Sequence, residues 1–320
     1  MARALALPIL LLTALRGGAE PQVPRESDAQ DPEAFRISVD VNLVELHATV
    51  RDRKGSSVSD LRAEHFEVSE DGVRQSIRLF RHEDIPVTVG LVIDHSGSMR
   101  GKLTEVIAAA RTFVQSSSPQ DQMFVINFND DVTLGLPAAI PFTNRVDELE
   151  RAISSTSTVG QTALYDAVVA ARKQVEAGSR EKKVLIVISD GEDNASAHKL
   201  AQVLQMAQQS NILVYTIGIF EPEDPDKNPG VLRRLAQTTG GEAFFPGELS
   251  EVIAICERIA RDIRNQYTLG YASTSTARAG VYRKISVAAR ADGRGRLSVR
   301  TRPGYTASVA SGPARNQDAK

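Results

Sequence analysis

The 320-residue chain has no tryptophan, a single cysteine and almost no net charge. Aromatic residues make up only 5% of it, which argues against stacking platforms for nucleic-acid bases. The formal net charge of −2 gives no electrostatic footprint for nucleic acid or an anionic membrane. The single cysteine, Cys256, excludes an internal disulfide and lies on an apolar helical stripe, so we expect a core thiol.

The chain also lacks an apolar run long enough to span a bilayer comfortably. Residues 1–19 instead have the pattern of a secretory signal peptide, with Arg3, the short apolar run Ala4–Leu15 and small residues at Gly17–Ala19. A membrane anchor is the alternative interpretation of this run. We therefore expect a secreted or periplasmic protein with a cleaved signal peptide and no stable membrane insertion afterwards.

The remaining chain divides by pattern into five segments. Prolines and polar residues without periodicity predict a disordered linker over 20–35, and small polar residues predict a disordered tail over 307–320. Alternating apolar residues and Asx-Gly turns predict β segments over 36–84 and 265–306, which we expect to pair into one small β-sandwich. Strands and helices alternate over 85–264, which predicts a separate α/β domain inserted between the two β segments.

The predicted fold class is thus α/β, with a doubly wound, mostly parallel, Rossmann-like sheet. The expected elements of this sheet and its helices follow from apolar runs of strand length and from stripes with helical spacing. The strands are expected at 87–93, 123–128, 183–188, 212–219 and 243–245, and the helices at 101–116, 145–154, 163–177, 198–209, 230–239 and 249–264.

A turn that offers oxygen ligands directly follows the first of these strands. Asp94, Ser96 and Ser98 stand at positions i, i+2 and i+4, which point the same way in an extended segment. Gly97 has no Cβ, so the backbone can bend tightly there. One carboxylate and two hydroxyls suit a hard cation such as Mg²⁺, Mn²⁺ or Ca²⁺, and suit zinc or copper poorly. The two serines could alternatively only cap the following helix.

Two later segments supply matching side chains. The strand expected at 183–188 ends in Ser189-Asp190-Gly191, so a second aspartate follows a buried strand. Thr162 lies near the N-terminus of the helix expected over 163–177. Because ligands of open α/β sheets gather outside the carboxyl ends of the strands, we expect Asp94, Asp190 and Thr162 to meet there.

The order and context of these residues resemble the metal-ion-dependent adhesion site of von Willebrand factor A domains. The similarity covers about Pro86 to Arg264, and the flanking segments further resemble the bacterial secreted family of A-domain-related proteins. The resemblance implies that the hydroxyls of Ser96, Ser98 and Thr162 touch the metal ion, and that Asp94 and Asp190 ligate it directly or through water. It also implies that one edge strand of the sheet runs antiparallel.

The resemblance and the ligand chemistry together predict an adhesion or interaction module that is not an enzyme. Mg²⁺, or Mn²⁺ or Ca²⁺ in its place, keeps coordination positions for water, and an Asp or Glu side chain of a protein partner can take one of them. We therefore expect an extracytoplasmic protein that captures an acidic partner residue through its ion.

Two other classes of function remain open. One is a Mg²⁺-dependent phosphatase of the haloacid-dehalogenase type, but the general acid expected two residues after Asp94 is here Ser96, which has no useful pKa near neutrality. The other is a structural surface or periplasmic scaffold whose ion only stabilises the fold. Around the site, we expect His95 to face solvent, Asp166 to be a local helix-start charge, and Glu221–Asp226 to form a solvated turn on the same rim.

Overall fold

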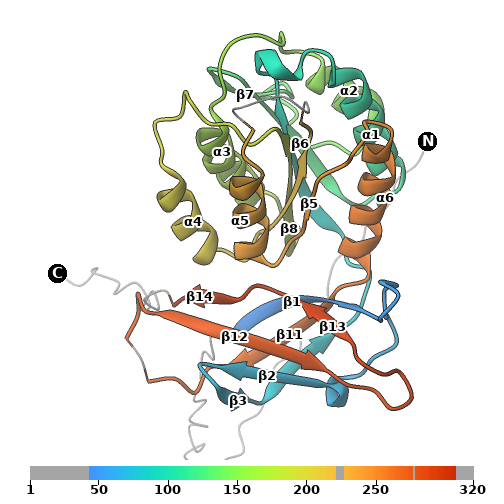
Figure 1. Ribbon diagram of the computed structural model, residues 1–320, viewed down its shortest axis with the longest axis vertical. Coiled ribbons are helices and arrows are strands. Elements are labelled where there is room, and N and C mark those ends of the chain that lie inside the picture. Colours follow the sequence, from blue (N-terminus) through green and yellow to red (C-terminus); the bar gives the residue numbers. More distant parts are fainter. Residues whose placement is uncertain (1–42, 221–226, 277, 308–320) are drawn as a thin grey trace, which may run out of the picture. The chain divides into compact units, whose positions relative to one another are not determined.

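The computed structural model describes residues 43–220, 227–276 and 278–307, which all fall within one compact unit (Figure 1). Several predicted segments lie outside the described residues: the signal peptide, the linker, residues 36–42 of the first β segment and the tail beyond Ala307. So does the predicted rim turn at Glu221–Asp226.

A six-stranded sheet lies at the centre of the α/β domain, in the order β10-β9-β8-β5-β6-β7. Every residue of the central strand β5 is buried, as expected for a strand covered on both faces. The first five strands in that order run parallel, whereas β7 pairs antiparallel with β6. The strands are β5 (Val87–Asp94), β6 (Gln122–Phe128), β7 (Val132–Leu134), β8 (Lys182–Ser189), β9 (Leu213–Gly218) and β10 (Ala243–Phe244).

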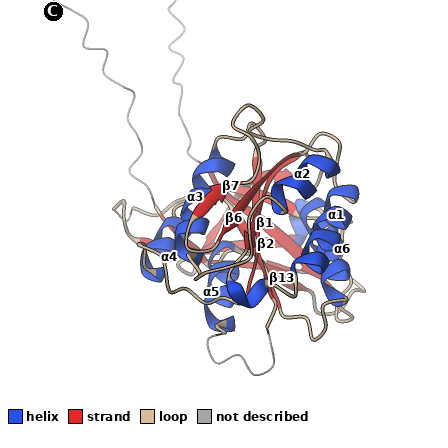
Figure 2. Cartoon of the chain, turned by 90° about the horizontal axis from the view of Figure 1, so that it is seen from above, coloured by secondary structure: helices blue, strands red, loops and turns tan. Residues whose placement is uncertain are grey.

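Helices cover both faces of this sheet (Figure 1, Figure 2). Helices α1, α2 and α6 pack on one face, and α3, α4 and α5 pack on the other. Each buries an apolar stripe, for example Val106, Ala110 and Phe113 of α1. Their bounds are α1 (Leu103–Gln115), α2 (Val146–Ile153), α3 (Leu164–Glu176), α4 (Leu200–Gln208), α5 (Pro229–Thr239) and α6 (Glu251–Arg264). Cys256 is buried on α6.

The flanking β segments form two further sheets of four strands, β13-β1-β11-β4 and β14-β12-β2-β3. Each sheet combines strands from before and after the α/β domain: Leu46 pairs with Leu269, and Val68 pairs with Val287. The strands are β1 (Leu43–Arg51), β2 (Phe66–Glu70), β3 (Val73–Gln75), β4 (Ile77–Arg81), β11 (Tyr267–Ala272), β12 (Tyr282–Ala289), β13 (Ser298–Arg300) and β14 (Gly304–Thr306). The predicted fold class, a doubly wound α/β sheet inserted between β segments, is confirmed.

Ion pairs tie helix α6 to the β segments. Asp262 on α6 is buried and accepts from Arg51 of β1 at 2.5 Å and from Arg300 of β13 at 3.1 Å. A short connection after Arg264 leads from α6 directly into β11. Among the described residues, no helix has both the length and the apolar character needed to cross a bilayer.

Gly241 shows how closely α5 and β9 are packed. A Cβ at this position would lie 2.0 Å from the backbone oxygen of Val214 on β9, which cannot move without disturbing the sheet. We expect Gly241→Ala to lower the free energy of unfolding by roughly 2–4 kcal/mol in urea titrations. Gly247→Ala is the matched control, because no atom lies within 4 Å of its added Cβ. Equal effects of the two substitutions would contradict this account of the packing.

Lys182 gives the stability a pH dependence. Its buried ammonium donates to the backbone oxygen of Ile263 at the end of α6, and burial lowers the pKa of Lys182 from 10.5 to about 7. Between these two values the unfolded chain holds a proton that the folded chain lacks, so the free energy of unfolding rises with pH from about 7 to 10.5.

Lys182→Met should flatten this rise and increase the free energy of unfolding at pH 7, by an amount on the order of a few kcal/mol. Urea titrations across the pH range measure both effects. Lys173→Met, at an exposed position of α3, is the control and should keep the wild-type slope. An unchanged slope in Lys182→Met would show that another group titrates in this window.

Candidate metal site

The carboxylate of Asp94 lies buried at the carboxyl end of β5. Its Oδ1 accepts from the backbone N–H of Ser96 at 2.8 Å, and its Oδ2 accepts from the hydroxyl of Ser189 at 2.6 Å. The first bond folds the chain back over the strand end, and a short 3₁₀ turn at Gly97–Met99 follows. This turn brings the hydroxyls of Ser96 and Ser98 within 3.1 Å of each other.

Asp190 reaches the same place from the neighbouring strand. β8 runs parallel to β5 and ends at Ser189, so Asp190 follows at the same edge of the sheet. The hydroxyl of Ser98 donates to Asp190 Oδ2 at 2.5 Å. Four of the five predicted site residues, namely Asp94, Ser96, Ser98 and Asp190, are therefore brought together in one hydrogen-bonded cluster with Ser189.

Thr162 stands on a loop that is hydrogen-bonded to both strand-end loops. Gly97 N–H donates to Gly160 O at 3.1 Å, and the N–H of Thr162 donates to Asn194 Oδ1 at 2.8 Å. Asn194 returns a bond from its own N–H to Thr162 O at 3.0 Å. The Thr162 hydroxyl itself is buried and has no hydrogen-bond partner among the described residues. A buried polar atom is rarely left unpaired, so this oxygen is available to a ligand.

The electrostatics of the cluster favour a cation. Burial raises the pKa of Asp94 to about 6, the Ser189 hydroxyl opposes this shift, and the nearby charge of Asp190 adds to it. Two carboxylates held this close repel each other, and a divalent cation between them removes the repulsion. The described residues contain no cluster of three or more His, Cys, Asp or Glu side chains placed to hold a metal. The donor set here is instead two carboxylates and three hydroxyls, which suits a hard cation.

The prediction for His95 is wrong. The side chain is fully buried, its Nε2 lies 3.2 Å from Asn127 Oδ1, and burial lowers its pKa. The cause is the backbone: His95 N–H donates to Phe128 O, and Val159 N–H donates to His95 O. These bonds fix the residue between β6 and the loop that carries Thr162, away from solvent.

The remaining neighbours of the site organise its loops. Asp166 does more than mark a helix start, because it accepts from the N–H groups of Ala197 and His198 and lies 2.6 Å from His198 Nδ1. Asn194, which holds Thr162, was not foreseen from the sequence, and neither was the role of Ser189. Ser189 could have been suspected because it directly precedes Asp190, whereas Asn194 carries no local signal.

Comparison with known proteins adds sequence relatives. The family model of the von Willebrand factor type A domain matches residues 88–255. Inter-alpha-trypsin inhibitor heavy chain H2 of Mus musculus is 27% identical over 173 residues, which cover 50% of this chain and 18% of that protein. Heavy chain H4 of Bos taurus is 30% identical over 117 residues, which cover 34% and 13%. The match thus spans less than a fifth of the length of these relatives.

Solved structures share the fold. A von Willebrand factor type A protein from Catenulispora acidiphila aligns with a TM-score of 0.50 at 12% identity, over 85% of this chain and 76% of that chain. Proximal thread matrix protein 1 from the mussel byssus, with a zinc-occupied MIDAS motif, aligns with a TM-score of 0.50 at 16% identity, over 62% and 50%. The family model covers more than half of the 320 residues, and the chain therefore belongs to the von Willebrand factor type A domain family.

Proposed function

We propose that this protein is an extracytoplasmic interaction module that captures an Asp or Glu side chain of a protein partner through a divalent cation. The cation would be held by Asp94, Ser96, Ser98, Thr162 and Asp190. The observation that carries the proposal is the buried, unpartnered hydroxyl of Thr162, on a loop hydrogen-bonded to both loops that bear the other four side chains.

The chemistry of these side chains suits capture of an acid. Asp94 and Asp190 supply two negative charges, which balance a divalent cation, and the three hydroxyls add oxygen ligands without adding charge. A hard cation bound this way keeps positions for water, so a carboxylate oxygen of the partner can replace one water. Membership of the von Willebrand factor type A family supports an interaction module rather than an enzyme.

Mg²⁺ is the proposed ion, with Mn²⁺ or Ca²⁺ as substitutes. The oxygen-only donor set supports this choice. A location outside the cytoplasm rests on the signal-peptide pattern of residues 1–19.

Thermal melting tests whether an ion binds at these residues. We expect Mg²⁺ or Mn²⁺ to raise the melting temperature relative to EDTA, because an ion that binds only the folded chain stabilises it. Asp94→Ala and Thr162→Ala should each remove the increase. Thr158→Ala, on the same loop as Thr162, and Asp131→Ala, at an exposed position, are controls that should retain it. Stabilisation that persists in both site variants would place the ion elsewhere.

Water-proton relaxation with Mn²⁺ tests whether the bound ion can accept a carboxylate. Mn²⁺ at the site should enhance relaxation through its bound waters, and acetate should reduce the enhancement by displacing one of them. Acetamide, a neutral molecule of similar shape, should leave it unchanged. If Mn²⁺ binds but acetate acts no differently from acetamide, the ion only stabilises the fold, and the scaffold interpretation replaces this proposal.

A further inference from the structure

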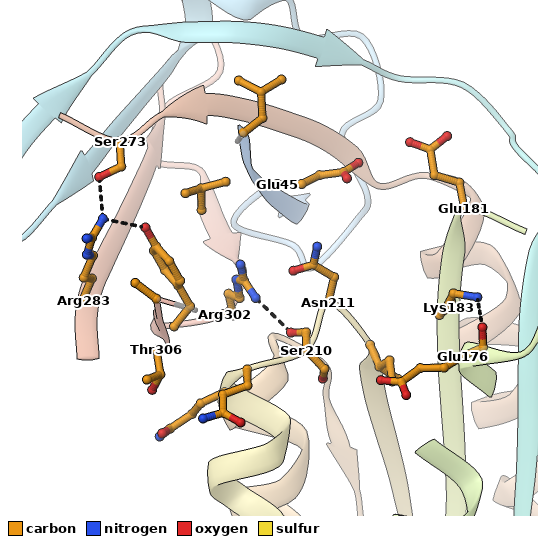
Figure 3. A pocket seen from close by; sticks show the side chains of 17 residues that line it. Glu45, Glu176, Glu181, Lys183, Ser210, Asn211, Ser273, Arg283, Arg302 and Thr306 are labelled. Carbon is orange, nitrogen blue, oxygen red and sulfur yellow. Dashed lines mark hydrogen bonds between the residues drawn. The ribbon is translucent and has the colours of Figure 1, made fainter. Parts of the chain in front are cut away.

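A cavity of about 770 Å³ lies far from the candidate metal site, beside the first residues of β1. Its walls come from β1 and β14, from the end of α4 and from the start of β8 (Figure 3). The volume is within the range of pockets that bind drug-sized molecules or a short peptide.

One wall of the cavity is an unpaired strand edge. β1 pairs along Leu43–Ala48 with β11 on one side. On its other side β13 pairs with Thr49–Arg51 only, so no described strand pairs with that edge of Leu43–Ala48. Leu43, Val44 and Glu45 also line the cavity. Free backbone N–H and C=O groups of such an edge are a template for an added strand.

The side chain of Arg302, which stands between β13 and β14 in the sequence, extends into the cavity; the charge of Glu45 acts on it without an ion-pair contact. Its side chain is only 9% exposed, it forms no ion pair with another described residue, and its Nε has no hydrogen-bond partner among them. One guanidinium nitrogen donates to Ser210 O at 3.0 Å, and the group lies 5.3 Å from the centre of the Tyr305 ring. A buried cation with these partners alone is costly, and an anion would stabilise it.

The other charges that line the cavity are already compensated. Arg283 donates to Ser273 and pairs with buried Glu70. Lys183 donates to three backbone oxygens at the end of α3. Glu45 and Glu181 both pair with Arg81, and Glu176 pairs with Arg172. Glu176, Glu181 and Lys183 lie on the opposite side of the cavity from Arg283 (Figure 3). An incoming acid is therefore directed to Arg302.

Arg302 is also held in place before any ligand arrives. Gly240, in the left-handed region at the end of α5, packs so closely that a Cβ there would lie 2.4 Å from the backbone nitrogen of Arg302. The bond to Ser210 fixes the guanidinium from the other direction. An anchored cation loses little entropy when it binds an anion.

We propose that this cavity binds an extended acidic peptide segment of a partner protein, which adds as a strand to the free edge of β1 and places a carboxylate against Arg302. The strand edge supplies main-chain hydrogen bonds, and Arg302 selects the acid. The cavity shares no lining residue with the candidate metal site, so a partner could contact the protein at two separate places.

A displayed library of short random peptides, selected on the full chain in EDTA, provides the test. We expect the selected peptides to share an acidic residue within an extended pattern. Arg302→Gln should weaken their affinity about 10- to 100-fold, the size expected for a charge-assisted hydrogen bond. Arg296→Gln, at an exposed position of the same β segment, should leave it unchanged. Asp94→Ala should also leave it unchanged, which separates this site from the metal-dependent one.

Hydrogen exchange on the complex tests the strand addition. Amide protons of Leu43–His47 should exchange more slowly when a selected peptide is bound, because the added strand accepts from some of them. The proposal is overturned if no peptide is enriched, if the enriched peptides bind Arg302→Gln and wild type equally, or if the amides of β1 gain no protection.

Discussion

The candidate site depends on one constraint: the neighbouring parallel strands β5 and β8 end at the same edge of the sheet. Val87 pairs with Lys182 and Ile93 with Ile188, so Asp94 and Ser189-Asp190 leave the sheet side by side. Because side chains alternate along a strand, a shift of one residue in this register would turn Asp94 to the opposite face. Burial of the apolar side chains of both strands fixes this register. The free energy of that burial thereby keeps two carboxylates close together in a buried environment.

The hydroxyls around these carboxylates serve two purposes. Ser189 and the backbone of Ser96 donate to Asp94, and Ser98 donates to Asp190. These donors reduce the repulsion between the two carboxylates, so the folded chain tolerates Asp94 and Asp190 side by side without a bound ion. A serine oxygen that donates its hydrogen to a carboxylate still presents lone pairs, so Ser98 can contact a cation without giving up its partner. Thr162 differs because its oxygen has no partner to keep, which makes it the residue whose environment most favours an incoming ion.

Much of the fold was predictable because buried parallel strands produce continuous apolar runs and their helices carry regular stripes. The sequence also indicated that Asp94, Ser96, Ser98 and Asp190 would meet, since all four follow strand ends; their role as metal ligands stays a prediction. The environment of His95 was not predictable, because it depends on bonds to Phe128 and Val159, which lie far away in sequence. The contact of Asn194 with Thr162 and the isolation of Arg302 are likewise properties of packing, and no local pattern carries them.

The insertion of the α/β domain has a mechanical consequence. The chain enters this domain from β4 and leaves it into β11, and these two strands are neighbours, with Phe80 paired to Leu269. We therefore expect tension applied along the chain at Leu43 and Thr306 to be carried by hydrogen bonds within the two four-stranded sheets. It does not reach the parallel sheet until β4 and β11 separate. Because β4 and β11 hold the two ends of the inserted domain together, we expect the domain to keep its shape under this force. The sheet edge where Asp94 and Asp190 lie is then not distorted by force applied at Leu43 and Thr306.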